Sequence, residues 1–252
     1  MTARRLLLPL ALLACLLGLW QFLASTGALA DLLGLEKYLV PSPAEIVSSL
    51  WENRDLLAED GWVTLREVVL GFLCAVVVGV AFAAAMHLSS LVHDAAYPLV
   101  VASQTIPIVV LAPILVIWFG YGIVPKLAIV ALICFFPIAV ATLDGLRSVD
   151  PAATKLMRTL YASRRQIFQR VEAPAALPSF FSGAKIAVAV APIGAVFAEW
   201  AGSSSGLGHL VLQDLGRFES ARIFAAVVVL SAIALVGFAL VALAERLVVT
   251  WR

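Results

Sequence analysis

The sequence predicts an all-α integral membrane protein with six transmembrane helices. Of its 252 residues, 63% are hydrophobic and only 13% are charged, and the mean hydropathy is +1.04. Soluble domains are about half apolar and about a quarter charged. Several apolar runs reach the roughly 20 residues that a helix needs to cross about 30 Å of hydrocarbon. The composition therefore excludes a soluble globular protein, and we expect residues 1–252 to form one transmembrane domain.

Six apolar segments account for the expected spans, which cover residues 6–25, 63–86, 97–119, 125–143, 179–201 and 222–248. The chain begins MTARRLLLPLALLAC, and this basic start with an apolar run is similar to a secretory signal peptide. Because the apolar run continues past Cys15 to Ala24, it is longer than the core of such a signal. We therefore expect an uncleaved first span.

The segment between the first two spans contains a helix-start signal. Ser42 and Glu45 have the spacing of a capping box, and Pro43 stands at the first helical position. This arrangement predicts a short amphipathic helix that begins at Pro43.

The segment 147–178 is too polar to lie in a membrane, because it carries six basic side chains between two apolar runs. Asp150 followed by Pro151 predicts the start of a short helix, and Ser163 with Gln166 forms a capping box for a second one. Both helices are amphipathic with basic flanks. Two interpretations remain open: the helices lie on anionic lipid headgroups, or they dock on another protein.

The distribution of basic residues predicts the orientation. With six spans, both termini lie on the same side as segment 147–178, and this side carries most of the Lys and Arg residues near the span ends. Cytoplasmic loops carry such an excess. We therefore expect segment 147–178 and both termini to be cytoplasmic.

Small residues recur at four-residue spacing in two spans: Gly71, Ala75, Gly79 and Ala83 in the second, and Gly183, Ala187, Ala191 and Ala195 in the fifth. Such stripes let helix backbones approach closely in lipid. Packing within the chain is the first interpretation, and a subunit interface or a sliding pore surface stays open. Prolines inside the spans are expected to kink or break them; they are Pro107, Pro113, Pro137 and Pro192.

Polar residues within spans are the candidates for a solute pathway. Ser103, Gln104 and Thr105 form a polar cluster, which either bonds neighbouring helices or lines a pore. Glu199, near the external end of the fifth span, is expected to pair with Arg217 or Arg222, or to contribute to a gate.

Nothing in the sequence indicates enzymatic chemistry. The residues His87, His93 and His209 stand alone, and the three cysteines lie inside apolar runs. The printed sequence contains no G-x-x-x-x-G-K-[ST] phosphate-binding loop. We therefore expect no catalytic residues, no metal, no cofactor and no ATP chemistry in this chain.

Several longer motifs are similar to those of one family. They are VPSPAEI (40–46), TIPIVVLAPILVIWFGYG (105–122), FFPIAVATLDGLRSVDP (135–151), VEAPAALP (171–178) and AEWAGSSSGLGHL (198–210). With them the chain resembles the permease subunits of binding-protein-dependent ABC importers, and most of all the branch that carries nitrate, sulfonates, taurine and thiamine precursors. Two departures stand in the cytoplasmic loop motif: Lys155-Leu156-Met157 replaces Glu-Ala-Ala, and Tyr161 replaces a glycine.

The resemblance implies a type I importer fold in the bacterial inner membrane, with the loop 147–178 as a coupling helix that docks on a separate ATPase subunit. The implied docking residues are Arg158, Leu160, Tyr161, Ala162 and Arg164. The implied partners are an ATPase dimer, a second permease subunit (a homodimer), an extracytoplasmic binding protein and the bilayer, without nucleic acid. The implied solute is a thiamine pyrimidine precursor, with sulfonate, taurine or nitrate as alternatives. An ion-coupled secondary transporter is the competing class.

Overall fold

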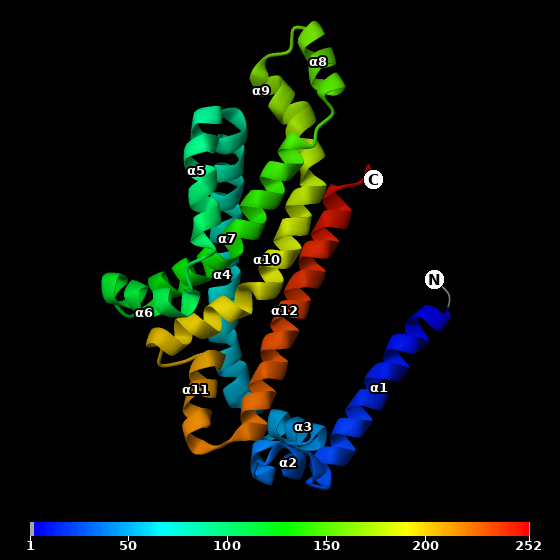
Figure 1. Cartoon of the computed structure of the whole chain (residues 1–252), viewed down its shortest axis with the longest axis vertical. Helices are drawn as coiled ribbons and strands as arrows, with labels where there is room; N and C mark the ends of the chain where they lie inside the picture. The colour runs from blue at the N-terminus through cyan, green and yellow to red at the C-terminus, as the bar shows by residue number, and fades with distance from the viewer. Residues whose placement is uncertain (1–2, 252) are drawn as a thin grey trace. The chain divides into compact units, whose positions relative to one another are not determined.

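The computed structural model describes residues 3–251, with side chains from residue 7 onward apart from residues 9 and 10, and every regular element in this range is a helix (Figure 1). The first residues of the predicted first span therefore lie outside the described side chains. The chain forms two compact units. One consists of Met1–Trp62 with Ser205–Ser231, and the other of Val63–Ser204 with Ala232–Arg252.

The first unit is built from short helices around the beginnings of two long ones. The predicted helix start at Pro43 is confirmed, because Ser42 accepts from the Glu45 amide and the Glu45 side chain accepts from the Ser42 amide at 2.7 Å. The elements are α1 (Ala3–Ser25), α2 (Ala28–Leu33), a 3-10 turn (Lys37–Leu39), α3 (Pro43–Glu52), the start of α4 (Arg54–Leu88), α11 (Leu207–Arg217) and the start of α12 (Ser220–Val248).

The second unit holds the long apolar helices. Its buried core joins α4, α7 and α10, with Ala75, Val130, Ile138 and Ala191 among the fully buried side chains. The elements are the remainder of α4, then α5 (Ser90–Ser103), α6 (Ile108–Phe119), α7 (Ile123–Arg147), α8 (Pro151–Thr159), α9 (Arg164–Ile167), a π-helical turn (Phe168–Glu172), α10 (Ala173–Gly202) and the end of α12.

The two stripes of small residues pack inside the chain, as the first interpretation predicted. A side chain at Gly71 would place its Cβ 2.5 Å from Val130 Cβ, and one at Gly79 would meet Ile138 at 3.0 Å. In α10, Gly183 faces the main-chain carbonyl of Pro137. These contacts bring α4 and α10 close against α7, so the small residues serve helix packing.

The third predicted span is not one continuous helix. Instead of a helix over 97–119, the chain forms α5 and α6, which are bent by 105° relative to each other. Pro107 caps α6 in an extended conformation, and a residue that precedes proline is disfavoured in the α region. The expected break at Pro107 is thus confirmed, whereas Pro113, Pro137 and Pro192 lie inside helices.

The remaining spans are longer than the sequence predicted. The second was expected to begin at residue 63, but α4 starts at Arg54 and runs for 35 residues, about 52 Å. Residues 164–202 form one helical segment of 39 residues. Within the described range, four helices are long and apolar enough to cross a membrane, or five if the bent pair α5–α6 counts as one span. Both long helices extend well beyond about 30 Å of hydrocarbon.

Candidate functional site

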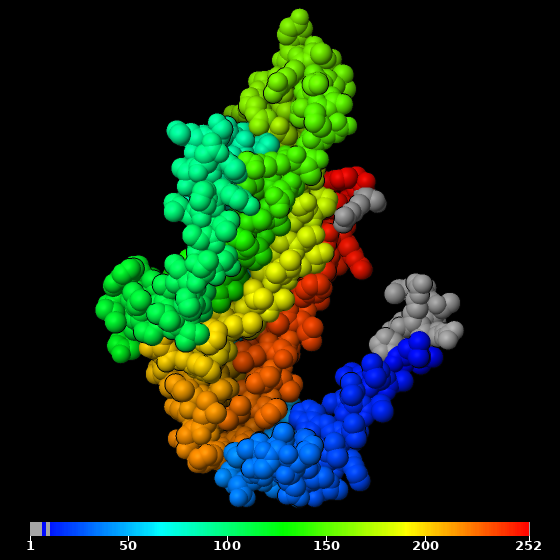
Figure 2. Space-filling view, viewed as in Figure 1, coloured from blue at the N-terminus to red at the C-terminus, as the bar shows by residue number. Residues whose placement is uncertain are grey.

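The polar segment 147–178 folds as the helix caps predicted. Asp150 accepts from the Ala152 amide at 2.7 Å and starts α8, and Pro151 occupies the first helical position. Ser163 and Gln166 complete a capping box that starts α9. In the space-filling view α8 and the turn that follows it project from the rest of their unit (Figure 2). The starts of both helices are therefore satisfied by caps within the segment.

The turn between α8 and α9 keeps a glycine-type geometry although a tyrosine occupies it. Tyr161 has φ +56°, a left-handed conformation that bulky residues rarely adopt. The Ala162 amide donates to Met157 O at 3.0 Å, and the Tyr161 amide donates to Arg158 O at 3.0 Å. This pair of bonds is a Schellman motif. Tyr161 therefore keeps the left-handed conformation of the glycine that it replaces, at a cost on the order of 1–3 kcal/mol.

The turn presents apolar side chains to the surroundings. Tyr161 is 97% exposed, Leu160 is 67% exposed and Leu156 is 62% exposed. The cationic residues Lys155 and Arg158 are also exposed on α8. An apolar tip with a basic rim is the kind of surface that suits an apolar groove with acidic edges on another protein.

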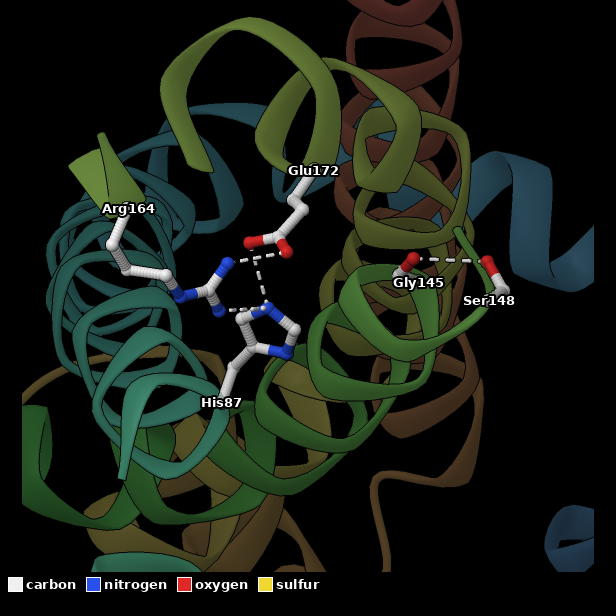
Figure 3. A network of polar contacts seen from close by, with 5 residues as sticks. All are labelled: His87, Gly145, Ser148, Arg164 and Glu172. Atoms are coloured by element: carbon white, nitrogen blue, oxygen red, sulfur yellow. Dashed lines mark hydrogen bonds and ion pairs between the residues drawn. The ribbon is translucent and has the colours of Figure 1, made fainter. Parts of the chain in front are cut away.

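Arg164, in contrast, bonds within the chain (Figure 3). Its guanidinium donates to Glu172 Oε1, and His87 Nε2 lies 2.9 Å from Glu172 Oε2. The Glu172 side chain is only 7% exposed. Figure 3 also shows the nearby end of α7, where the Ser148 hydroxyl donates to Gly145 O at 2.9 Å.

The structure thereby adds two residues that the sequence did not single out. His87 is isolated in the sequence, but folding brings it to Glu172, which is 85 positions away. No local spacing or capping signal marks such a pair, because the contact depends on how α4 packs beside the helix that carries Glu172.

A cavity of about 820 Å³ lies where α5 and α6 meet α7 and α10. Ser103 and Gln104 line it, whereas Thr105 is absent from its lining and its hydroxyl donates to Ala102 O at 2.8 Å. The lining residues are Ser103, Gln104, Ile106, Pro107, Ile108, Leu111, Leu132, Ile133, Phe136, Pro137, Val140, Ala141, Asp144, Ile186, Val190 and Phe197.

Glu199 lies in a buried polar network between α10 and α4. It is 1% exposed and accepts from the Thr64 hydroxyl at 2.7 Å. Close by, Lys126 donates to Glu67 and to Ser203, both at 2.6 Å. Glu199 thus joins α10 to α4 and does not contribute to the cavity lining.

Arg222, which was one of two cations expected to pair with Glu199, donates to Asp214 at 2.7 Å instead. This pair lies inside the first unit, where Asp214 is fully buried. The expected pairing of Glu199 with Arg222 is therefore wrong. The short turn after α11 brings Arg222 back to Asp214, which lies in α11 eight residues earlier.

Comparisons with known proteins agree on one family. The family described as "Binding-protein-dependent transport system inner membrane component" matches residues 75–250. A "Probable ABC transporter permease protein" of Haemophilus influenzae is 40% identical over 92% of both chains. The formylaminopyrimidine transport permease protein ThiX of Halalkalibacterium halodurans is 39% identical, covering 86% of this chain and 87% of that relative.

Among solved structures, a subunit of the inward-facing methionine ABC transporter MetNI has a TM-score of 0.68 at 18% identity, covering 78% of this chain and 98% of that one. This similarity shows the fold, which is that of type I ABC importer permeases. Together with the matched residues, it leads to the conclusion that the chain belongs to the family of inner-membrane permease subunits of binding-protein-dependent ABC importers.

Proposed function

We propose that this permease couples solute uptake to ATP hydrolysis by docking the tip of its α8–α9 segment on a separate ATPase subunit. The observation that carries this proposal is the apolar tip, which is exposed yet held rigid by two helix caps and a Schellman motif. The proposed docking residues are Arg158, Leu160, Tyr161, Ala162 and Arg164; Arg164 bonds with Glu172 but its side chain is still 45% exposed. As a member of its family, the chain is a multipass inner-membrane transport component and not an enzyme.

The transport cycle follows from a two-state rigid-body switch. Each permease subunit contributes one coupling segment, residues 147–178. When an ATPase dimer closes on ATP, it draws the two coupling segments together and opens the pathway outward. An extracytoplasmic binding protein then releases its solute into the pathway, and hydrolysis returns the permease to the inward-open state. The second permease subunit is a second copy of this chain, and the coupling segment and both termini face the cytosol.

Ala162→Asp tests the docking surface. A carboxylate at the tip would have to be desolvated inside the docking groove, so we expect weaker binding of the ATPase subunit and loss of ATP-driven uptake. Ala152→Asp is the matched control, because Ala152 is exposed in the first turn of α8, where a negative charge is favourable. Binding of the purified ATPase subunit to both variants in nanodiscs is the measurement. Equal binding by both variants would refute the docking assignment.

The lining of the cavity favours a flat, uncharged or weakly basic solute. Among the residues that line it, all within the described range, Asp144 is the only ionisable one. The aromatic rings of Phe136 and Phe197 offer stacking surfaces, and Ser103 and Gln104 offer hydrogen bonds. These features suit a thiamine pyrimidine precursor, and the similarity to ThiX supports the same choice.

Sulfonate, taurine and nitrate are the alternative solutes. Sulfonates and nitrate are anions, and taurine carries a sulfonate group, so a lining without Lys or Arg among these cavity residues offers them no compensating charge. Uptake of a labelled formylaminopyrimidine and of labelled taurine into vesicles that contain the complete transporter distinguishes the two classes. An ion-coupled secondary transporter would show uptake in vesicles that lack the ATPase subunit.

A further inference from the structure

We infer that Arg164, Glu172 and His87 form a clamp that fastens the coupling segment to α4, so that a pull on α9 moves α4 and α10 as one body (Figure 3). The inference rests on the proposed function, because it concerns how docking at the tip reaches the spans. All three are positioning residues. They act through the coupling segment and contact neither the solute nor the nucleotide.

The connections of the coupling segment to α10 and to α4 differ in kind. Residues 164–202 form one helical segment, so α9 is joined covalently and continuously to α10. His87, by contrast, lies one residue before the end of α4, and 76 residues separate it from Arg164. Without a side-chain contact at this point, movement of α9 would reach α4 only indirectly. The clamp supplies that contact.

Glu172 is the centre of the clamp because both of its oxygens are engaged. Oε1 accepts from Arg164, and Oε2 lies 2.9 Å from His87 Nε2. A buried carboxylate needs such donors, and charge-assisted bonds are stronger than neutral ones. The Glu172 side chain is 7% exposed and that of His87 is 12% exposed, so water competes little for either group.

The Glu172 carboxylate constrains the tautomer of the His87 ring. His87 Nε2 lies 2.9 Å from Glu172 Oε2 and 3.1 Å from Arg164 Nη2. A carboxylate only accepts hydrogen bonds, so Nε2 must carry a hydrogen to bond with it. In the other neutral tautomer, a lone pair on Nε2 would face the lone pairs of Oε2. With its hydrogen directed at Glu172, Nε2 cannot also accept from Arg164, which only donates, so the 3.1 Å approach of Arg164 Nη2 is a close contact and not a second hydrogen bond.

The π-helical turn Phe168–Glu172 is the local device that presents Glu172 to α4. One additional residue in a helical turn rotates the following side chains by about 100° around the axis. The same turn carries Phe168, whose ring lies 6.2 Å from the His87 ring, centroid to centroid. Apolar and charged contacts thus meet on the last turn of α4, and π-helical turns of this kind are frequent at functional sites.

The clamp joins helices that are already packed closely. Gly71 and Gly79 bring α4 against α7, and Gly183 brings α10 against α7. Fastening α9 to the end of α4 therefore completes a rigid group of three helices. We expect this group to keep one internal geometry in both states of the transport cycle.

The test is a distance measurement within the full chain. Val77 is exposed on α4 and Arg165 is exposed on α9, so both accept spin labels after conversion to cysteine, with the native cysteines replaced by alanine. The labelled chain is diluted with unlabelled chain in nanodiscs. Double electron–electron resonance is recorded for the permease alone and for its complex with the ATPase subunit, with and without ATP and vanadate.

In the chain with the intact clamp, we expect one narrow distance distribution that does not change with nucleotide. Glu172→Gln and His87→Leu should broaden the distribution and make it depend on nucleotide. His87→Gln, which keeps an N–H donor on a side chain of similar reach, should restore the narrow distribution. In the complex, ATP hydrolysis by the altered chains should stay within about twofold of that by the intact chain, because the clamp does not contact the nucleotide.

The outcomes are separable. If Glu172→Gln fails to insert or fold, the distance distribution of His87→Leu still shows whether the clamp holds α9 to α4. Identical narrow distributions in the intact and altered chains would overturn the clamp, whether or not an ATPase subunit binds. If the unaltered chain does not bind the ATPase subunit, the proposed function fails, and the distances in the permease alone still decide whether the clamp exists.

Discussion

Tyr161 combines an unfavourable backbone conformation with a fully exposed side chain. Its left-handed conformation completes the Schellman motif after α8, and its ring is 97% exposed at the tip of the coupling segment. A glycine would adopt the same turn without the steric cost. The proposed docking on an ATPase subunit would give this exposed ring a partner, which a glycine could not provide.

Tyr161→Gly should separate these two contributions. We expect the isolated permease to gain about 1 kcal/mol of unfolding free energy, because the strained conformation is relieved. Binding of the ATPase subunit should become weaker, because the exposed ring is lost. Denaturant unfolding in detergent and affinity for the ATPase subunit are the two measurements.

Phe218→Gly is the matched control for this change. Phe218 has φ +59° at the end of α11, where the Glu219 amide donates to Asp214 O at 3.1 Å. The same relief of strain is expected there, while affinity for the ATPase subunit should not change. A Tyr161→Gly permease that binds the ATPase subunit as tightly as the unaltered one would remove the ring from the docking surface.

At the scale of elements, the caps and apolar runs predicted which segments are helical, and packing decided where the helices end. The capping boxes at Ser42 and Ser163 could be predicted from the sequence, because both partners of a capping box lie within one helical turn. The bend between α5 and α6 could be predicted only in part, since Pro107 predicts a break but not the angle of 105°. The π-helical turn at Phe168–Glu172 has no sequence signal of its own.

Gly183→Ala tests the packing of α10 on α7. A Cβ at this position would meet the main-chain carbonyl of Pro137, and a backbone group cannot move aside at low cost. We expect a loss of about 1–3 kcal/mol in unfolding free energy. Gly216→Ala in α11 is the control, because a Cβ there meets nothing within 4 Å. Thermal unfolding in the same detergent compares the two, and equal midpoints would argue against close packing at Gly183.

At the scale of the whole molecule, uptake by the complete transporter tests whether the cavity between α5, α6, α7 and α10 is the solute pathway. Asp144 is the residue by which this permease should discriminate among solutes, since no Lys or Arg shares the cavity lining with it. Asp144→Asn should lower uptake of a labelled formylaminopyrimidine, whereas Asp144→Glu should retain most of it.

Asp144→Lys should be the most damaging of these changes for a basic solute, because it reverses the charge. ATP hydrolysis measured in parallel shows that the transporter is still assembled. Unchanged uptake in all three variants would mean that Asp144 does not face the solute.

The sequence by itself determined the fold class, the family resemblance and the capped helix starts at Pro43, Pro151 and Arg164, because these depend on hydropathy and on contacts within one helical turn. Only the tertiary structure decided that Arg164 faces Glu172 and His87, that Glu199 bonds with Thr64, and that Arg222 belongs to Asp214. For the contacts of His87 with Glu172 and of Thr64 with Glu199, the physical reason is separation along the chain. Thr64 and Glu199 are 135 residues apart, and such pairs exist only after the helices have packed.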